Sequence, residues 1–147
     1  MTTPDNAQNV IEIIQLALTP VFLIVGIGQL LNVVTNRVAR IIDRARWLNN
    51  QNDIHQNDDS KSKELTILDK RLKFANWAIT FLTGAAVIIC LDIILLIANG
   101  LINMDLAQAV LILFITSIGS ITGGLFSFFI EVSLATATLK VNLKKIR

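Results

Sequence analysis

The chain has 147 residues, of which 53% are hydrophobic and 16% charged, and its formal net charge is +2. Soluble domains carry about 25% charged residues and lack uncharged stretches of about 20 residues, so this composition excludes a soluble globular enzyme and a disordered chain. A single cysteine excludes an internally disulfide-bonded module. We therefore expect an all-α integral membrane protein with one small membrane domain and no enzymatic activity.

Three apolar segments are long enough to cross a bilayer as helices, because a hydrocarbon core about 30 Å thick needs about 20 helical residues. They are residues 12–36, 75–98 and 106–130. Apart from Glu12 and Asp92 they carry no charged residue, and none alternates with a period of two, which disfavours a transmembrane β-barrel. The sequence predicts three transmembrane helices.

Small and polar side chains recur along the first span at intervals of three, four or seven residues. They are Gln15, Thr19, Gly26, Gln29 and Asn36. Such a series favours close helix packing in lipid, and the alternative is a face that lines a water-filled path. Pro20 lacks a backbone donor, which predicts a bend or an unbonded carbonyl at Leu16.

The basic residues predict the orientation of the chain. Nine of the 13 Lys and Arg lie between Arg37 and Lys73, and the other four lie between Lys140 and Arg147. Because basic loops face the cytoplasm, the N-terminus and the connection at residues 99–105 are expected outside, and the basic C-terminal tail, residues 140–147, inside.

Residues 37–73 predict a helical hairpin that protrudes into the cytoplasm, with a polar loop tip at residues 49–63. Apolar residues recur at helical spacing on both arms, so the arms are expected to pack together. These residues are Val38, Ile41, Ile42, Ala45 and Leu48, followed by Leu65, Leu68 and Leu72. Arg37, Arg40 and Arg44 share another face, where they signal topology, pair between helices, or bind anionic lipid headgroups or a partner.

Asp92 is an acidic residue inside the second span. A charged Asp near the bilayer centre costs about 2.5–3.5 kcal/mol, and no Lys or Arg lies in any predicted span to pair with it. Candidate partners at a matching depth are Gln15 and Thr19 on the first span, or the same residues of a neighbouring subunit. We expect Asp92 to make a structural hydrogen bond, to serve an ion or proton pathway, or to lie at the membrane interface.

The third span carries a second series of polar and small residues. It comprises Thr116, Ser120, Gly124, Ser127 and Glu131, with Gly119 and Gly123 beside it. The series indicates helix packing or, in a ring of subunits, the lining of a path, because three helices cannot easily enclose a pore alone. Glu131 ends this span at the depth of Arg37 and Arg40, which predicts an ion pair between the third and first helices.

Motifs for other functions are missing from the sequence. It has no glycine-rich phosphate loop and no Ser-His-Asp set, and His55 with its neighbouring aspartates matches no calcium-binding loop. Cys90, inside an apolar segment, is expected to be a small buried hydrophobic residue. Six acidic residues mixed into the basic hairpin argue against nucleic-acid binding. We expect no cofactor, no metal and no nucleic-acid partner.

The stretches LALTPVFLIVGIGQLLNVVTNRVARIIDRAR (16–46), RLKFANWAI (71–79) and FFIEVSLAT (128–136) resemble a bacterial family of membrane proteins, domain of unknown function 2721. The resemblance covers most of the chain, and its most specific motif is RVARIIDRAR directly after the first span. It implies a multi-pass protein of the bacterial cytoplasmic (inner) membrane and supplies no reaction or ligand. Many relatives look as if they carry arginine before the glutamate, where this chain has Ile130, which leaves Glu131 without an adjacent opposite charge.

Two functions fit these observations. The first is a small homo-oligomeric channel or permeation protein for an inorganic cation, in which Asp92 attracts or relays the ion, the third-span series lines the path and Glu131 lies at the inner mouth. The alternative is a non-transporting accessory or scaffold protein that binds a cytoplasmic partner through the hairpin.

Overall fold

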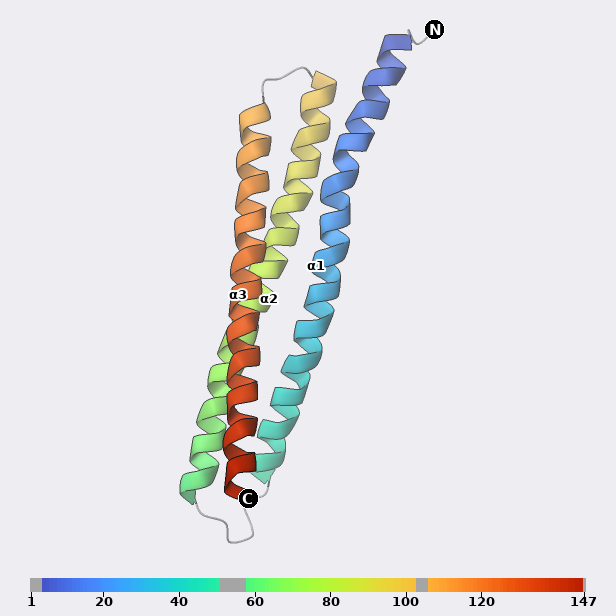
Figure 1. Cartoon of the computed structure of the whole chain (residues 1–147). Coiled ribbons are helices and arrows are strands. Elements are labelled where there is room, and N and C mark those ends of the chain that lie inside the picture. Colours follow the sequence, from blue (N-terminus) through green and yellow to red (C-terminus); the bar gives the residue numbers. More distant parts are fainter. Residues whose placement is uncertain (1–3, 51–57, 103–105, 147) are drawn as a thin grey trace. The chain divides into compact units, whose positions relative to one another are not determined.

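The computed structural model describes the backbone of residues 4–50, 58–102 and 106–146, and the side chains of residues 11–50, 62–100 and 106–136. Within these ranges the chain forms three helices and no strand: α1 (Pro4–Asn50), α2 (Asp58–Ile102) and α3 (Ala107–Ile146) (Figure 1). Each helix contains a stretch long and apolar enough to cross a membrane. The predicted all-α fold with three spanning helices is confirmed, and the chain is a multi-pass membrane protein.

All three helices extend beyond their predicted spans. α1 runs through the first span and the first arm of the hairpin without interruption, although Pro20 lies inside it. A single proline removes only one backbone donor, and lipid penalises every further unbonded group, so the helix continues on both sides of it. α3 likewise continues through the basic tail to Ile146.

The loop between α1 and α2 differs from the predicted tip at residues 49–63. α1 includes Asn49 and Asn50, and α2 begins at Asp58. Residues 51–57, among them His55, lie outside the described residues.

The buried residues follow a seven-residue repeat on α1 and α3. On α1 they are Pro20, Ile27, Val34, Ile41 and Leu48, and on α3 they are Ser117, Gly124 and Glu131. On α2 they are Leu68 and then, alternating at three and four residues, Ala75, Ala78, Leu82, Ala85, Ile89 and Asp92. Spacings of this kind keep one face of a helix toward its neighbour, as in coiled coils. The small residues in the series let the backbones approach closely.

Contacts between the helices divide the chain into two compact units. Unit 1 consists of Met1–Leu30 and Phe81–Thr122, and unit 2 of Leu31–Thr80 and Gly123–Arg147. Asp92 belongs to unit 1. Glu131 and the hairpin, called the stalk below, belong to unit 2.

Unit 1 is held by close helix approach and by hydrogen bonds between its elements. The Ser120 hydroxyl on α3 donates to the Phe81 carbonyl on α2 at 2.8 Å. The backbone N–H of Leu106, just before α3, donates to the Asn99 side chain at 3.1 Å. A Cβ added at Gly100 would lie 2.5 Å from Cδ1 of Ile13, so α1 and α2 meet closely at this point.

In unit 2, the two arms of the stalk pack through aliphatic side chains. Ile41 and Leu48 of α1 form a buried cluster with Leu68 of α2, and Ala45, Leu65 and Leu72 pack against it. Arg44 Nε donates to Glu64 at 2.9 Å beside this cluster. The arms therefore run antiparallel and meet through the predicted apolar faces.

The buried alanines of α2 give a test of this packing. Ala85 is fully buried, whereas Val87, two residues further on, is 57% exposed. Ala85→Leu is expected to lower the free energy of unfolding by about 1–3 kcal/mol through overpacking. Val87→Leu should change it little, since its side chain faces away from the other helices. Thermal unfolding of both variants in detergent measures the difference, and equal melting temperatures would contradict this packing.

Candidate functional site

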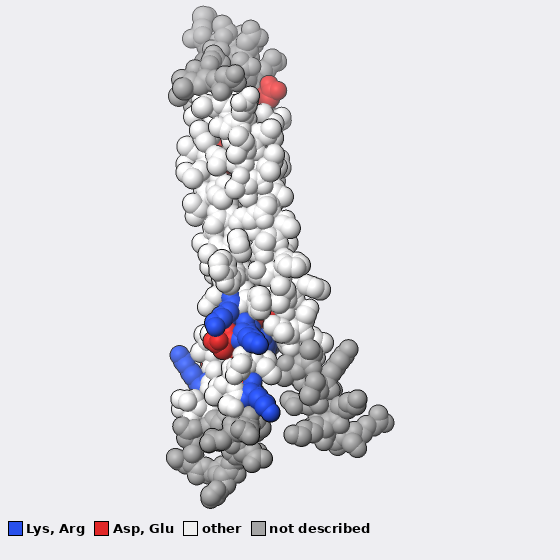
Figure 2. All heavy atoms as spheres, turned by 90° about the vertical axis from the view of Figure 1, so that its left-hand side faces the viewer, with Lys and Arg blue, Asp and Glu red and all other residues white. Residues whose placement is uncertain are grey.

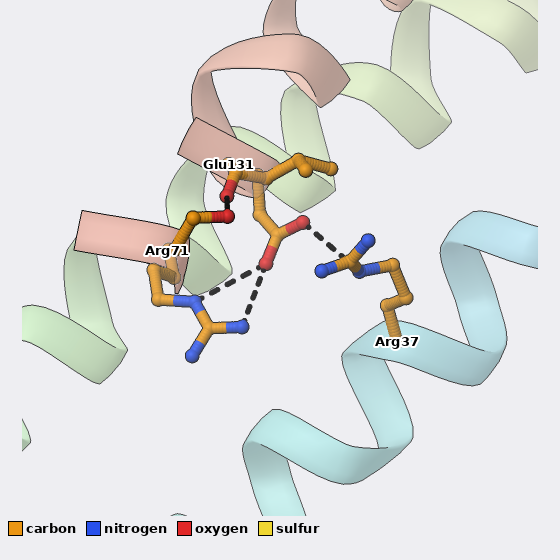
Figure 3. A network of polar contacts seen from close by, with 5 residues as sticks. Arg37, Arg71 and Glu131 are labelled. Atoms are coloured by element: carbon orange, nitrogen blue, oxygen red, sulfur yellow. Dashed lines mark hydrogen bonds and ion pairs between the residues drawn. The ribbon is translucent and has the colours of Figure 1, made fainter. Parts of the chain in front are cut away.

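Glu131 is the centre of a polar network in unit 2. Its side chain is fully buried on α3, and it meets one arginine from each of the other helices (Figure 3). Arg71 of α2 donates to Oε1 through Nε at 3.2 Å and through Nη2 at 2.9 Å. Arg37 of α1 places Nε 3.2 Å from Oε2. One carboxylate thus links all three helices.

The two arginines contribute differently. Arg71 makes two hydrogen bonds to one oxygen, whereas the Arg37 contact has the distance of an ion pair but not the angle of a hydrogen bond, so Oε2 accepts none. Arg37 also lies over the Phe128 ring, 5.6 Å from its centroid. We regard Arg71 as the stronger partner, because direction as well as distance determines the strength of a hydrogen bond.

The network compensates an unfavourable burial. A carboxylate removed from water is tolerated when it is paired with opposite charge, and two guanidinium groups flank Glu131, of which Arg71 also donates two hydrogen bonds to Oε1. The arginines keep contact with solvent, with side chains 35% exposed for Arg37 and 20% for Arg71. Figure 2 shows basic and acidic side chains gathered next to one another beside an uncharged surface. The network therefore fixes the helices to one another at the edge of the apolar region.

The expected ion pair between α3 and α1 is present as Arg37–Glu131, but Arg40 is not part of it. Arg40 is exposed, and Arg44 instead pairs with Glu64. The sequence reasoning missed Arg71, the better-bonded partner. The signal was available: Arg71 precedes the second span by one helical turn, and Arg37 directly follows the first, so both lie at the same end of the apolar segments. Glu131 therefore has two opposite charges although Ile130 precedes it.

Asp92 is buried in unit 1 without a comparable partner. It is 2% exposed, and its Oδ1 atom has no hydrogen-bond partner. Gln15 and Thr19, the predicted partners, are both exposed on α1. Within the chain, the match in depth does not bring them to Asp92, because neither residue lies on the face of α1 that turns toward α2, and pairing with the same residues of a neighbouring subunit stays a prediction. A buried carboxylate oxygen is thus left unbonded inside an apolar helix.

Pro20 and Asp92 lie at the same level of unit 1. Ile13 of α1 meets Gly100 of α2. Pro20 lies seven residues after Ile13, and Asp92 lies eight residues before Gly100. α1 and α2 run in opposite directions there (Figure 1), so both residues lie about 10–12 Å from that contact. Pro20 is buried and has no N–H to bond the Leu16 carbonyl. α2 therefore presents an unbonded acceptor at Asp92, and α1 presents at Leu16, about one helical turn nearer to the Ile13 contact, a carbonyl that lacks its usual backbone donor.

The polar series on α3 does not form one continuous open face. Gly124 and Glu131 are buried, and Ser120 bonds to α2. Thr116 is exposed, with its hydroxyl bonded to the Ile112 carbonyl of its own helix at 2.7 Å. Ser127 is half-buried. Gly119 faces open space, so it contributes no close packing inside the described chain.

The polar series on α1 has the opposite character. Gln15, Thr19, Gly26, Gln29 and Asn36 are all exposed, and a Cβ added at Gly26 would meet no atom within 4 Å. Asn36 donates to the Asn32 side chain at 3.2 Å, and both amides remain exposed. We call the five residues of this series the α1 polar face.

The stalk contains an apolar groove of about 410 Å³ in unit 2. Aliphatic residues of both arms line it, with polar groups at its edge: Ile41, Ile42, Ala45, Arg46, Asn49, Leu65, Leu68, Asp69 and Leu72. In the part of the chain that the structure describes, no group of three or more His, Cys, Asp or Glu side chains is arranged to hold a metal ion.

The unequal roles of the arginines can be tested by stability. Arg71→Met is expected to lower the free energy of unfolding by about 3 kcal/mol, because it leaves a buried carboxylate with only the ion pair from Arg37. Arg44→Met removes an exposed pair and should cost about 0–1 kcal/mol. Thermal unfolding in detergent compares the two, and equal losses would contradict the stated importance of the Glu131 network.

The family model for proteins of unknown function DUF2721 matches residues 17–141 of the chain. The matched segment includes Glu131, both of its arginines, Asp92 and Pro20. Neither a curated protein nor a solved structure matches the sequence. Because the match covers most of the chain, the protein belongs to the DUF2721 family.

Proposed function

We propose that this protein is a small homo-oligomeric permeation protein of the bacterial inner membrane that moves a monovalent cation across the bilayer at Asp92. The observation that carries the proposal is the buried Oδ1 atom of Asp92, which has no hydrogen-bond partner. An ionisable residue inside a membrane span is costly to keep, and such residues mark ion and proton pathways. Its N-terminus lies outside and its C-terminus in the cytoplasm, as the basic residues indicate.

The charges around Asp92 favour a monovalent cation. The sequence has no Lys or Arg between residues 74 and 139 or before residue 37. One carboxylate balances one positive charge, whereas a divalent ion would keep an uncompensated charge in a low-dielectric region. The Leu16 carbonyl, about one helical turn away along α1, is a second oxygen near this region, and carbonyl oxygens replace the hydration shell of monovalent ions in selective channels.

The access route that we assign runs along α1. Gln15 and Thr19 are exposed on the same turns of α1 as Leu16 but on the side away from α2, so their oxygens are polar groups that an ion or a water molecule meets on the outer side of α1 before it reaches Asp92. This assignment replaces α3 as the lining element, since Ser120, Gly124 and Glu131 are engaged in packing or bonding. Glu131, neutralised by two arginines, supports the helices and does not attract ions.

Flux measurements test the proposal. The purified full chain in liposomes is expected to pass protons or Na⁺, each measured separately under an imposed gradient. Asp92→Asn should reduce the flux about tenfold or more, because each 1.4 kcal/mol of lost charge stabilisation slows passage about tenfold. Asp43→Asn, at an exposed position in the stalk, is the matched control and should retain full flux.

Two results would contradict the permeation function. One is a wild-type protein that assembles normally in liposomes and passes neither ion. The other is an Asp92→Asn variant that conducts as well as the wild type. A strictly monomeric protein in mild detergent would argue against the oligomeric form of the proposal, because three helices cannot easily enclose a water-filled path alone.

The stalk groove favours a second candidate, a membrane-anchored scaffold. The groove has aliphatic walls with Arg46 and Asp69 at its edge, which suits an amphipathic helix of a soluble partner. Under this function Ile42→Asp, in the groove wall, should abolish co-purification of one defined partner from native membranes. Thr66→Asp, at an exposed position in the same stalk, should preserve it. Ion flux with no partner, or a partner that both variants retain, would exclude this candidate.

A further inference from the structure

The amides of the α1 polar face, Gln29 and Asn36, lie opposite the residues that α1 buries within the chain. Gln29 follows the buried Ile27 by two positions, and Asn36 follows the buried Val34 by two. Two residues correspond to about 200° around a helix, so the amides point almost directly away from the packed side. The described parts of α2 and α3 therefore do not cover these amides.

An open amide face is unfavourable in hydrocarbon. A side-chain amide has two donor hydrogens and an acceptor oxygen, and lipid tails can bond none of them. Gln29 lies seven residues before the end of the predicted first span, about 10 Å into the apolar region. Asn36 and Asn32 bond to one another, which leaves further donors and acceptors on both. The face therefore needs a polar partner at the same depth.

We propose that this partner is the α1 polar face of a second copy of the chain, so that the oligomer forms through parallel α1 helices. This proposal rests on the proposed function, because it specifies how the homo-oligomer proposed there is assembled. An amide both donates and accepts, so identical amides brought together by a symmetry axis complement one another. Copies inserted in the same orientation place each residue at the depth of its own counterpart.

Two further features suit a second copy. Gly26 lies within the face, and the absence of atoms around it leaves room for close approach of another backbone. Beyond the span the series continues to Arg40, and Asp43 follows three residues later, both exposed. In a parallel pair, Arg40 of one copy lies within reach of Asp43 of the other. A purely apolar partner would satisfy neither the amides nor these charges.

Cysteine cross-linking in native membranes tests the interface with controls at adjacent positions. Cys90, which the sequence predicted to be buried, is exposed, so single cysteines are introduced in a Cys90→Ser background as Gln29→Cys and Asn36→Cys on the face. The controls are Gly28→Cys and Thr35→Cys, which replace exposed residues about 100° away. A disulfide requires Cα atoms within about 7 Å, so only residues that face their counterparts form it efficiently.

The face variants are expected to yield about tenfold more covalent dimer than their neighbours, a ratio equivalent to 1.4 kcal/mol. Equal yields at all four positions, or dimers only at the controls, would overturn the interface. As a second measurement, the double variant Gln29→Leu and Asn36→Leu should shift the protein toward monomer in detergent, and an unchanged oligomer would also overturn it. Cross-links on the face without ion flux would refute permeation alone, whereas flux without these cross-links would refute this interface alone.

Discussion

The absence of hydrogen-bond partners in lipid governs how this chain arranges its polar groups. Several hydroxyls are satisfied within their own helix, as Thr116 and Thr122 are by carbonyls four residues earlier. Ser120 is satisfied between helices. The ionised Glu131 needs more, and it draws a guanidinium group from each of the other two helices. Asp92 differs from these groups, because its buried Oδ1 atom has no hydrogen-bond partner among the described residues.

The same repeat that permits close packing explains why a glutamate is buried. Ser117 and Gly124 are small, and their positions on α3 let the helices approach. The next position of that repeat is Glu131, so the geometry that buries two small residues also carries a carboxylate into the interior. Arg37 and Arg71 lie where α1 and α2 leave their apolar segments, and from there they reach it. Packing and ion pairing in unit 2 therefore depend on one helical register.

The sequence was sufficient to predict the helices, the antiparallel stalk and the Arg37–Glu131 pair, because continuous apolar runs and charge at helix ends depend on local patterns. The sequence was insufficient to predict which side of its helix each residue lies on. Gln15 and Thr19 match Asp92 in depth but lie on the wrong side of α1, and Arg40 lies at the depth of Glu131 but points outward. Depth can be counted along one helix, whereas rotation is set by the neighbours that it packs against. The seven-residue repeat of Ile27, Val34 and Ile41 contains that information, because it marks the side of α1 that is buried.

The register of α1 also limits how this protein can vary in length. A single residue inserted between Val34 and Arg37 would turn everything after it by about 100°. The turn would carry Arg37 away from Glu131 and Ile41 away from Leu68 in one step. Inserting seven residues would preserve the phase but would displace both groups along the helix axis by about 10 Å. Insertions and deletions among relatives should therefore collect in the segments that join the helices, while the stretch from Val34 to Leu48 keeps a constant length.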